Sequence, residues 1–151
     1  MPQSLAAVYV HLVYSTKNRI PFLATPAMQK RTFAYLAALS AKMDFPALIV
    51  GGQPDHMHML ARMSRTHSIA EWIKELKRLS NLWVSNQGVT YTDFAWQGGY
   101  GAFSVSHSNL NTVKKYILNQ NEHHKKITFQ NEYRALLKKH TIEYDERYVW
   151  D

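Results

Sequence analysis

The chain has 151 residues, no cysteine and 46% hydrophobic side chains. This hydrophobic fraction is too high for a disordered chain, and the missing cysteines exclude a disulfide scaffold, a thiolate zinc finger and a cysteine nucleophile. Lys and Arg number 18 against 11 Asp and Glu, and the net charge of +7 suits a polyanionic partner. Neither a membrane-spanning apolar run nor the pattern of a signal peptide is present. We therefore expect a cytoplasmic protein with no membrane association.

Predicted strands and helices alternate along the chain. A stretch rich in Val and Tyr favours a first strand. Thr25 followed by Pro26 indicates a helix start, and Ser68 with Glu71 three residues later forms a capping box at another. The predicted elements, in chain order, are strand 5–16, helix 26–43, strands 45–53 and 55–63, helix 68–86, a strand ending near 106, and helices 109–126 and 129–140.

The order βαββαβαα predicts an α+β fold with a ferredoxin-like or RRM-like antiparallel sheet and helices packed on one face. The other face of the sheet would then be free for a ligand or a partner. Residues 1–151 contain no long linker or repeat, so we predict a single domain. The acidic, aromatic tail over 141–151 is expected to dock on the body of the domain or on a partner subunit.

His56 and His58 flank Met57 on a predicted strand. Side chains alternate along a strand, so both imidazoles lie on one face while Met57 points to the other. Two imidazoles at this spacing can converge on one metal ion, but they form an incomplete site by themselves. Histidines that are merely hydrogen-bonded or solvated would give the same pattern.

Tyr116 and Gln120 are four residues apart on a predicted helix and therefore face the same direction. An ordinary tyrosine beside a polar neighbour on a surface helix shows the same spacing. If this pair meets the two histidines, the Gln120 amide oxygen can complete a metal site for Mg²⁺ or Mn²⁺. The metal would neutralise a phosphate, so that the Tyr116 phenol can attack it and form a phosphotyrosine. Rejoining would then need no ATP.

Basic side chains are the candidates for gripping a single-stranded DNA backbone, with aromatic rings as stacking partners. A solvated helix face would have the same composition. His123 and His124 follow Gln120 by one helical turn and could contact a phosphate, whereas His11, His67, His107 and His140 have no informative spacing. The DNA-binding candidates are Arg62, Arg65, Lys74, Lys77, Arg78, Lys114 and Lys115.

Taken together, His56-Met57-His58, the basic helix, WQGGYGAFSVS and YILNQNEHHKK resemble the HUH single-tyrosine transposases of the smallest bacterial and archaeal insertion sequences. The resemblance covers Tyr9 to Trp150. It implies a metal-dependent DNA strand transferase and endonuclease acting on single-stranded DNA with hairpin ends, with a 5′-phosphotyrosine intermediate and a 3′-OH product. Tyr116 would be the nucleophile, and His56, His58 and Gln120 the metal ligands. It also implies a homodimer with a merged sheet, in which the tyrosine helix of one subunit often completes the metal site of the other.

Two other functions fit the same residues. A non-catalytic or domesticated regulator that binds single-stranded nucleic acid would bind without metal and would be indifferent to loss of Tyr116. A metal phosphodiesterase that uses water as its nucleophile would leave no protein–DNA adduct. The presence or absence of such an adduct separates these functions.

Overall fold

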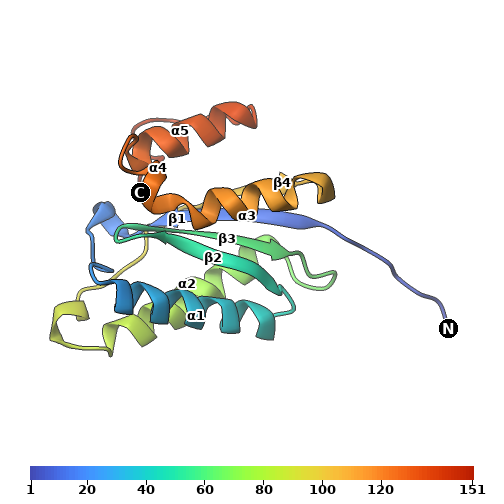
Figure 1. Ribbon diagram of the computed structural model, residues 1–151. Coiled ribbons are helices and arrows are strands. Elements are labelled where there is room, and N and C mark those ends of the chain that lie inside the picture. The colour runs from blue at the N-terminus through green and yellow to red at the C-terminus, as the bar shows by residue number, and fades with distance from the viewer.

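The computed structural model describes all 151 residues as a four-stranded antiparallel sheet between two layers of helices (Figure 1). The strands follow the order β2-β3-β1-β4 across the sheet, as in a ferredoxin-like fold. The α+β class and the antiparallel sheet are therefore as predicted. The strands are β1 (Tyr9–Ser15), β2 (Ala47–Gln53), β3 (His56–Arg62) and β4 (Gly101–Val105), and the helices are α1 (Pro26–Lys42), α2 (Ile69–Ser85), α3 (Leu110–Leu118), α4 (Gln120–His123) and α5 (Phe129–Lys139).

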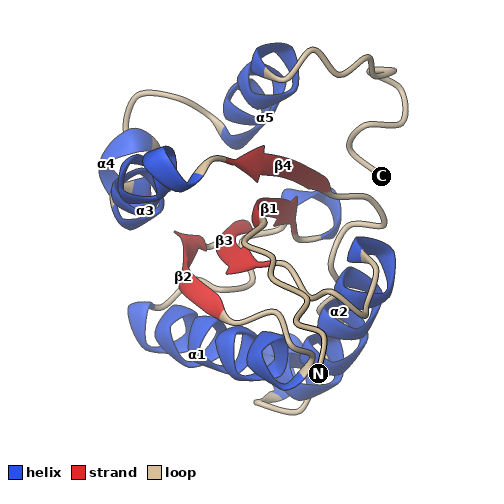
Figure 2. Ribbon diagram, turned by 90° about the vertical axis from the view of Figure 1, so that its right-hand side faces the viewer, coloured by secondary structure: helices blue, strands red, loops and turns tan.

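Helices α1 and α2 cover one face of the sheet (Figure 2). Their starts follow the predicted caps: the Thr25 side chain accepts from Met28 N at 3.1 Å, and that of Ser68 accepts from Glu71 N at 3.1 Å. The main hydrophobic core fills the space between these helices and the sheet, where alternate residues of β1 and β3 point. Its largest members include Leu12, Tyr14, Leu36, Phe45, Met57, Met59, Trp72, Ile73 and Leu76.

The opposite face of the sheet is not free, contrary to the prediction, because α3, α4 and α5 lie across it (Figure 2). Residues on both faces of strands β1 and β3 are buried, so a second layer of helices must shield the other face from solvent. A smaller hydrophobic cluster forms there from Val13, Phe103, Phe129, Tyr133 and Leu137. The predicted helix over 109–126 is divided at Asn119 into α3 and α4.

Strands β2 and β3 match the predicted strands 45–53 and 55–63 and form a hairpin, with Gln53 paired to His56 across the Pro54–Asp55 turn. Gly51 on β2 lets α3 approach closely, because a Cβ there would lie 2.9 Å from Ile117 Cγ2 and 3.0 Å from the Ile117 carbonyl oxygen. The missing side chain thus sets the distance between α3 and the sheet.

The C-terminal segment 141–151 packs on the body of the same chain. The Asp151 carbonyl accepts from Gly99 N at 2.8 Å, and the Trp150 ring lies 5.0 Å from the Arg134 guanidinium. Lys77 orders the glycine-rich segment beneath the tail by donating to the carbonyls of Gln97, Gly98 and Gly99 at 2.6 to 3.2 Å. No helix combines the length and apolar character needed to cross a bilayer.

Candidate metal and tyrosine site

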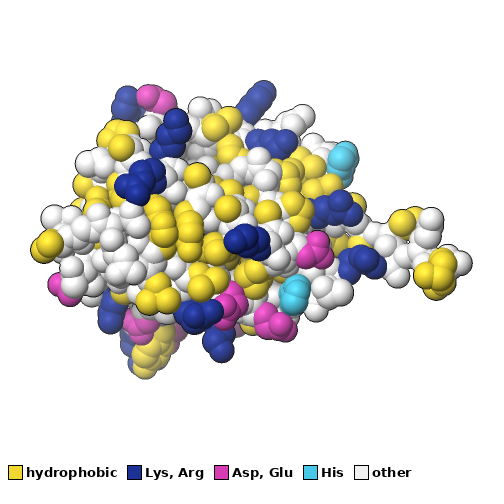
Figure 3. Space-filling model, turned by 90° about the horizontal axis from the view of Figure 1, so that it is seen from below, with side chains coloured by type: hydrophobic (Ala, Val, Ile, Leu, Met, Phe, Trp, Pro, Cys, Tyr) yellow, Lys and Arg dark blue, Asp and Glu magenta, His cyan; other side chains and the backbone are white.

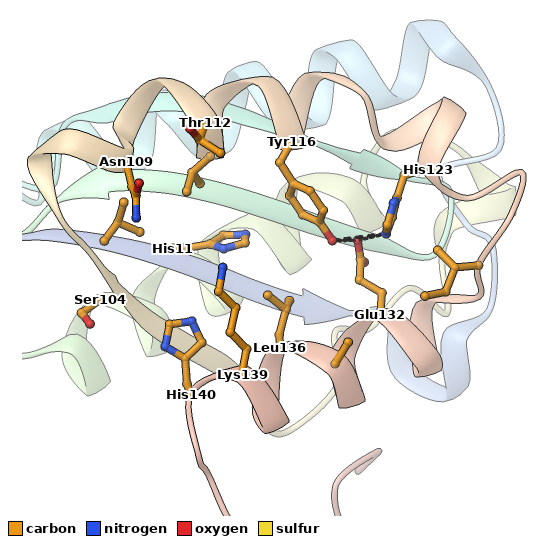
Figure 4. Close-up of a pocket in the computed structure, with 14 residues that line it drawn as sticks. His11, Ser104, Asn109, Thr112, Tyr116, His123, Glu132, Leu136, Lys139 and His140 are labelled. Atoms are coloured by element: carbon orange, nitrogen blue, oxygen red, sulfur yellow. Dashed lines mark hydrogen bonds and ion pairs between the residues drawn. The ribbon is translucent and has the colours of Figure 1, made fainter.

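His56 and His58 project from β3 toward the layer formed by α3, α4 and α5, and both are fully buried. Gln120 begins α4, and its Oε1 lies 2.9 Å from His56 Nε2. Tyr116, one turn earlier on α3, turns its hydroxyl toward the same cluster (Figure 4). The structure therefore brings together all four residues of the two sequence patterns.

Glu132 of α5 lies at the centre of this cluster and is not among the residues predicted for the site. Its Oε1 lies 3.1 Å from Nε2 of both His58 and His124. Its Oε2 accepts a hydrogen bond from Gln120 Nε2 at 3.1 Å and another from the Tyr116 hydroxyl. One carboxylate thus joins the predicted metal ligands to the predicted nucleophile.

A signal for Glu132 does exist in the sequence. The helix Phe129–Lys139 begins at the Thr128 cap and buries Phe129, Tyr133 and Leu137 at a spacing of four residues. Glu132 lies beside this apolar stripe and is 2% exposed. Buried carboxylates are rare unless they are paired or ligate a metal, so an acidic residue at such a position indicates a polar site beneath the helix.

The electrostatics of the site favour an ionised Glu132 and act differently on the histidines around it. Burial at His124 is outweighed by the hydrogen bond and charge of Glu132, which raise the pKa of that imidazole. Burial opposes ionisation of Glu132, but the hydrogen bonds from His124 and His58 outweigh it and hold the pKa of Glu132 well below its usual range. Burial lowers the pKa of His58, and burial together with His58 lowers the pKa of His11 to about 3. Neutral imidazoles are the form in which histidine binds metals.

The Tyr116 phenol stays protonated in this environment. Burial raises its pKa above the ordinary tyrosine value, and the negative charge of Glu132 raises it further. His123 Nε2 lies 3.4 Å from the hydroxyl oxygen. A phenol in this state needs a proton acceptor before it can act as a nucleophile, and Glu132 already accepts its hydrogen.

The outer contacts of the two histidines orient them for a cation. Asp55 Oδ1 lies 2.7 Å from His56 Nδ1, and His11 Nε2 lies 2.8 Å from His58 Nδ1. When the Nδ1 hydrogen of His56 is donated to Asp55, Nε2 is the ring atom left to ligate a metal, and the neighbouring Gln120 Oε1 is an acceptor. A cation between these two atoms would satisfy both, and carboxylate partners of this kind are usual for metal-binding histidines.

The donor set fits a divalent cation. His56 Nε2, His58 Nε2 and a Glu132 oxygen form a group of possible ligand atoms within 4.8 Å of one another, and Gln120 Oε1 adjoins it. Two imidazoles with an amide and a carboxylate oxygen suit Mn²⁺ or Mg²⁺. His123, His124 and Glu132 form an overlapping group.

All groups of the cluster come from one chain. Helix α3 follows β4 after a short connection and lies across β2 and β3, so Tyr116 reaches the histidines of its own subunit. The expectation that a partner subunit supplies the tyrosine helix is therefore not needed to assemble this site.

The basic candidates on α2 lie across the sheet from the cluster. Lys77 is mostly buried and uses its ammonium group on backbone carbonyls, and burial lowers its pKa to about 8. Arg78 pairs with Glu75 at 2.7 Å, leaving Lys74 as the third candidate on this helix. Figure 3 views the α1 and α2 side, where Lys and Arg are scattered among other side chains and form no single patch.

The remaining basic candidates fall into two groups. Arg62 ends β3, at the opposite end of the strand from His56, and donates to the Ala6 carbonyl at 2.9 Å, while Arg65 lies in the following loop. Lys114 and Lys115 share α3 with the tyrosine. Of the seven candidates, only these two lysines lie on the tyrosine helix, while Arg62 lies on the strand of the two histidines but at its far end.

Comparison with known proteins gives no match among curated proteins. A family model described as "Transposase IS200 like" matches residues 4–120. The chain belongs to the IS200-like transposase family. This membership gives the protein a transposase role, and the match includes the two histidines of β3, Tyr116 and Gln120, whereas Glu132 lies beyond it.

Two solved structures share the fold of this IS200-like transposase. A candidate transposase from Deinococcus radiodurans R1 is 20% identical, with a TM-score of 0.62 over 80% of this chain and 95% of that one. A REP-associated tyrosine transposase, solved bound to a REP hairpin, is 12% identical, with a TM-score of 0.58 over 84% of this chain and 76% of that one.

Proposed function

We propose that this IS200-like transposase is a metal-dependent, single-tyrosine HUH enzyme that cuts and rejoins single-stranded DNA. The observation that supports the proposal is the hydrogen bond from the Tyr116 hydroxyl to Glu132, a residue of the group whose four atoms could ligate a metal. A nucleophile, its proton acceptor and a cation site are the parts that phosphodiester transfer to a tyrosine requires.

His56, His58, Gln120 and Glu132 would hold the cation, which neutralises the negative charge of the scissile phosphate when bound. As the Tyr116 oxygen bonds to phosphorus, its proton passes to Glu132 Oε2. The bond between phosphorus and the 3′-oxygen breaks, and that oxygen takes a proton from water. The products are a 5′-phosphotyrosine and a free 3′-OH.

The reverse sequence rejoins DNA without another energy source. A 3′-OH attacks the phosphotyrosine and gives its proton to water, the bond between Tyr116 and phosphorus breaks, and Glu132 returns the proton to the phenol oxygen. The number of phosphodiester bonds is unchanged over cleavage and rejoining, so strand transfer needs no ATP. The Glu132 carboxylate, whose charge favours the protonated form of Tyr116, would thus also return the proton to Tyr116 after strand transfer.

The proposed substrate is single-stranded DNA that carries hairpins near the ends of the element. A structural neighbour was solved with a REP hairpin. Lys114 and Lys115 lie on the tyrosine helix and would contact backbone phosphates near the cut. A homodimer belongs to the proposal, with each chain providing its own site.

The test is adduct formation with hairpin-bearing oligonucleotides taken from the DNA that flanks the gene, with Mn²⁺ present. A 3′-end label should move with the protein on a denaturing gel, because the 5′-phosphotyrosine keeps the downstream strand, and a 5′-end label should appear on a short free fragment. Tyr116→Phe should abolish both signals, and Tyr148→Phe, at an exposed position, should leave them intact. Binding without cleavage would favour the regulator, and cleavage that leaves both labels free would favour a water nucleophile.

A further inference from the structure

A cavity of about 350 Å³ lies beside Tyr116, between α3 and α5 and over β1 and β4 (Figure 4). Tyr116 and Glu132 line it, so it is continuous with the atoms that would react at the scissile phosphate. Its size lies within the range of small-molecule sites, which starts at roughly 300 Å³. The mechanism above uses none of the other residues that line this cavity.

The polar groups of the cavity are available to a ligand. Asn109 occupies the N-cap position of α3, but its side chain makes no capping hydrogen bond. An Asn at this position normally accepts from the first turn of the helix. Its amide instead faces the cavity, which Thr112, one turn along α3, also lines (Figure 4). Lys139 projects from α5 into the same space and belongs to none of the ion pairs of the structure.

Flat rings form part of the wall. The His140 ring stacks on Phe103, with centroids 4.7 Å apart and planes inclined at 22°. Tyr116 lines the side of the cavity formed by α3. A flat heterocycle can be held by rings of this kind while amide and hydroxyl groups bond to its edge, and single-stranded bases are recognised in this way.

We propose that this cavity binds the base of the nucleotide next to the scissile phosphate, an inference that rests on the proposed function. The base would lie near Tyr116 and His140, with its edge toward Asn109 and Thr112. Lys139 would contact the phosphate that bears this nucleotide. Holding one base here would place the adjoining phosphate at the Tyr116 hydroxyl and would make cleavage depend on the identity of that base.

The test uses the four deoxynucleoside 5′-monophosphates as probes, with deoxyribose 5-phosphate and inorganic phosphate as probes without a base. Amide chemical-shift changes in the ¹⁵N-labelled protein give both the position and the affinity of binding. At least one nucleotide should saturate shifts on α3 and α5, and deoxyribose 5-phosphate should bind about tenfold more weakly, because base stacking and edge contacts are lost. Equal binding of the probes without a base, or shifts confined to other surfaces, would overturn the proposal.

Matched variants separate the cavity from its surroundings. Asn109→Ala, Thr112→Val and Lys139→Ala should each weaken nucleotide binding by about fivefold, the effect of losing one hydrogen bond. Asn111→Ala and Lys138→Ala remove the same groups from neighbouring exposed positions outside the cavity and should change nothing. Equal effects of Asn109→Ala and Asn111→Ala would count against the cavity.

The result is independent of the proposed chemistry, because nucleotide binding is measured without cleavage. Adduct formation on Tyr116 by a protein whose cavity binds no nucleotide would leave the transposase proposal standing and remove the base pocket. Nucleotide binding in the cavity of a protein that forms no adduct would remove the transposase proposal and leave a nucleotide-binding cavity.

Discussion

Replacing Glu132 by Gln tests the link between the metal ligands and the nucleophile. The substitution keeps the shape of the side chain but removes the one carboxylate among the four ligand atoms and the acceptor of the Tyr116 hydrogen. Mutating a residue that only supports a metal ligand typically lowers metal affinity by about 10- to 100-fold. Loss of a ligand should therefore lower the affinity for Mn²⁺ by at least about tenfold, or ~1.4 kcal/mol. Loss of the proton acceptor should slow adduct formation by a further 10² to 10⁴, roughly.

Two measurements separate these effects. Electron paramagnetic resonance of free Mn²⁺ gives the affinity in the absence of DNA, and the denaturing gel gives the rate of adduct formation at saturating Mn²⁺. Glu122→Gln is the matched control, because it makes the same charge change at an exposed residue that pairs with Lys125 at 2.9 Å. Thermal unfolding checks that each variant is folded. If Glu132→Gln and Glu122→Gln bound Mn²⁺ equally and formed adduct at equal rates, the role assigned to Glu132 would be refuted.

Three further predictions concern the placement of α3, the origin of the tyrosine and the buried histidine behind the site. Gly51→Val should push α3 away from β2 and slow adduct formation by about 10- to 100-fold. Gly88→Ala is the control, because its Cβ would meet only one side chain at 3.8 Å, and it should leave the rate on the gel unchanged. Equal rates for the two variants would show that the close approach at Gly51 does not position α3. Mixing a Tyr116→Phe subunit with a His56→Ala subunit should not restore adduct formation, because each chain assembles its own site; recovery would show that the helix acts in the partner. The pKa of His11 is lowered to about 3 in the folded chain. As the pH falls below the ordinary pKa of histidine, only the unfolded chain therefore binds a proton at His11. The free energy of unfolding should therefore decrease by about 2 kcal/mol between pH 7 and pH 5, and urea titrations of His11→Asn should show a smaller decrease; an unchanged pH dependence would contradict this cause.

Much of the fold could be predicted because its signals are local. The caps at Thr25 and Ser68 lie within one turn of the helices that they start. The second helical layer could not be foreseen in the same way, because it depends on both faces of β1 being buried. Val13 and the two histidines of β3 look like ordinary members of alternating strands until α3, α4 and α5 cover them.

The site residues show the same division between local and long-range information. His56 and His58 share a strand face, and Tyr116 and Gln120 share one side of the chain at the junction of α3 and α4, so simple spacing identifies each pair. Glu132 lies on a different helix, 12 residues after Gln120 and 74 after His58, and its role depends on where α5 docks. On α2, charge alone did not show that Lys77 is occupied by backbone carbonyls.

The most direct test of the account is to locate the DNA on the protein after a single round of cleavage. The adduct formed with a hairpin-bearing strand and Mn²⁺ would be digested with trypsin and nuclease and sequenced by tandem mass spectrometry. We predict a nucleotide linked through its 5′-phosphate to Tyr116, one of nine tyrosines in the chain. A nucleotide attached to any other tyrosine, or cleaved DNA with no attached peptide, would contradict the central claim.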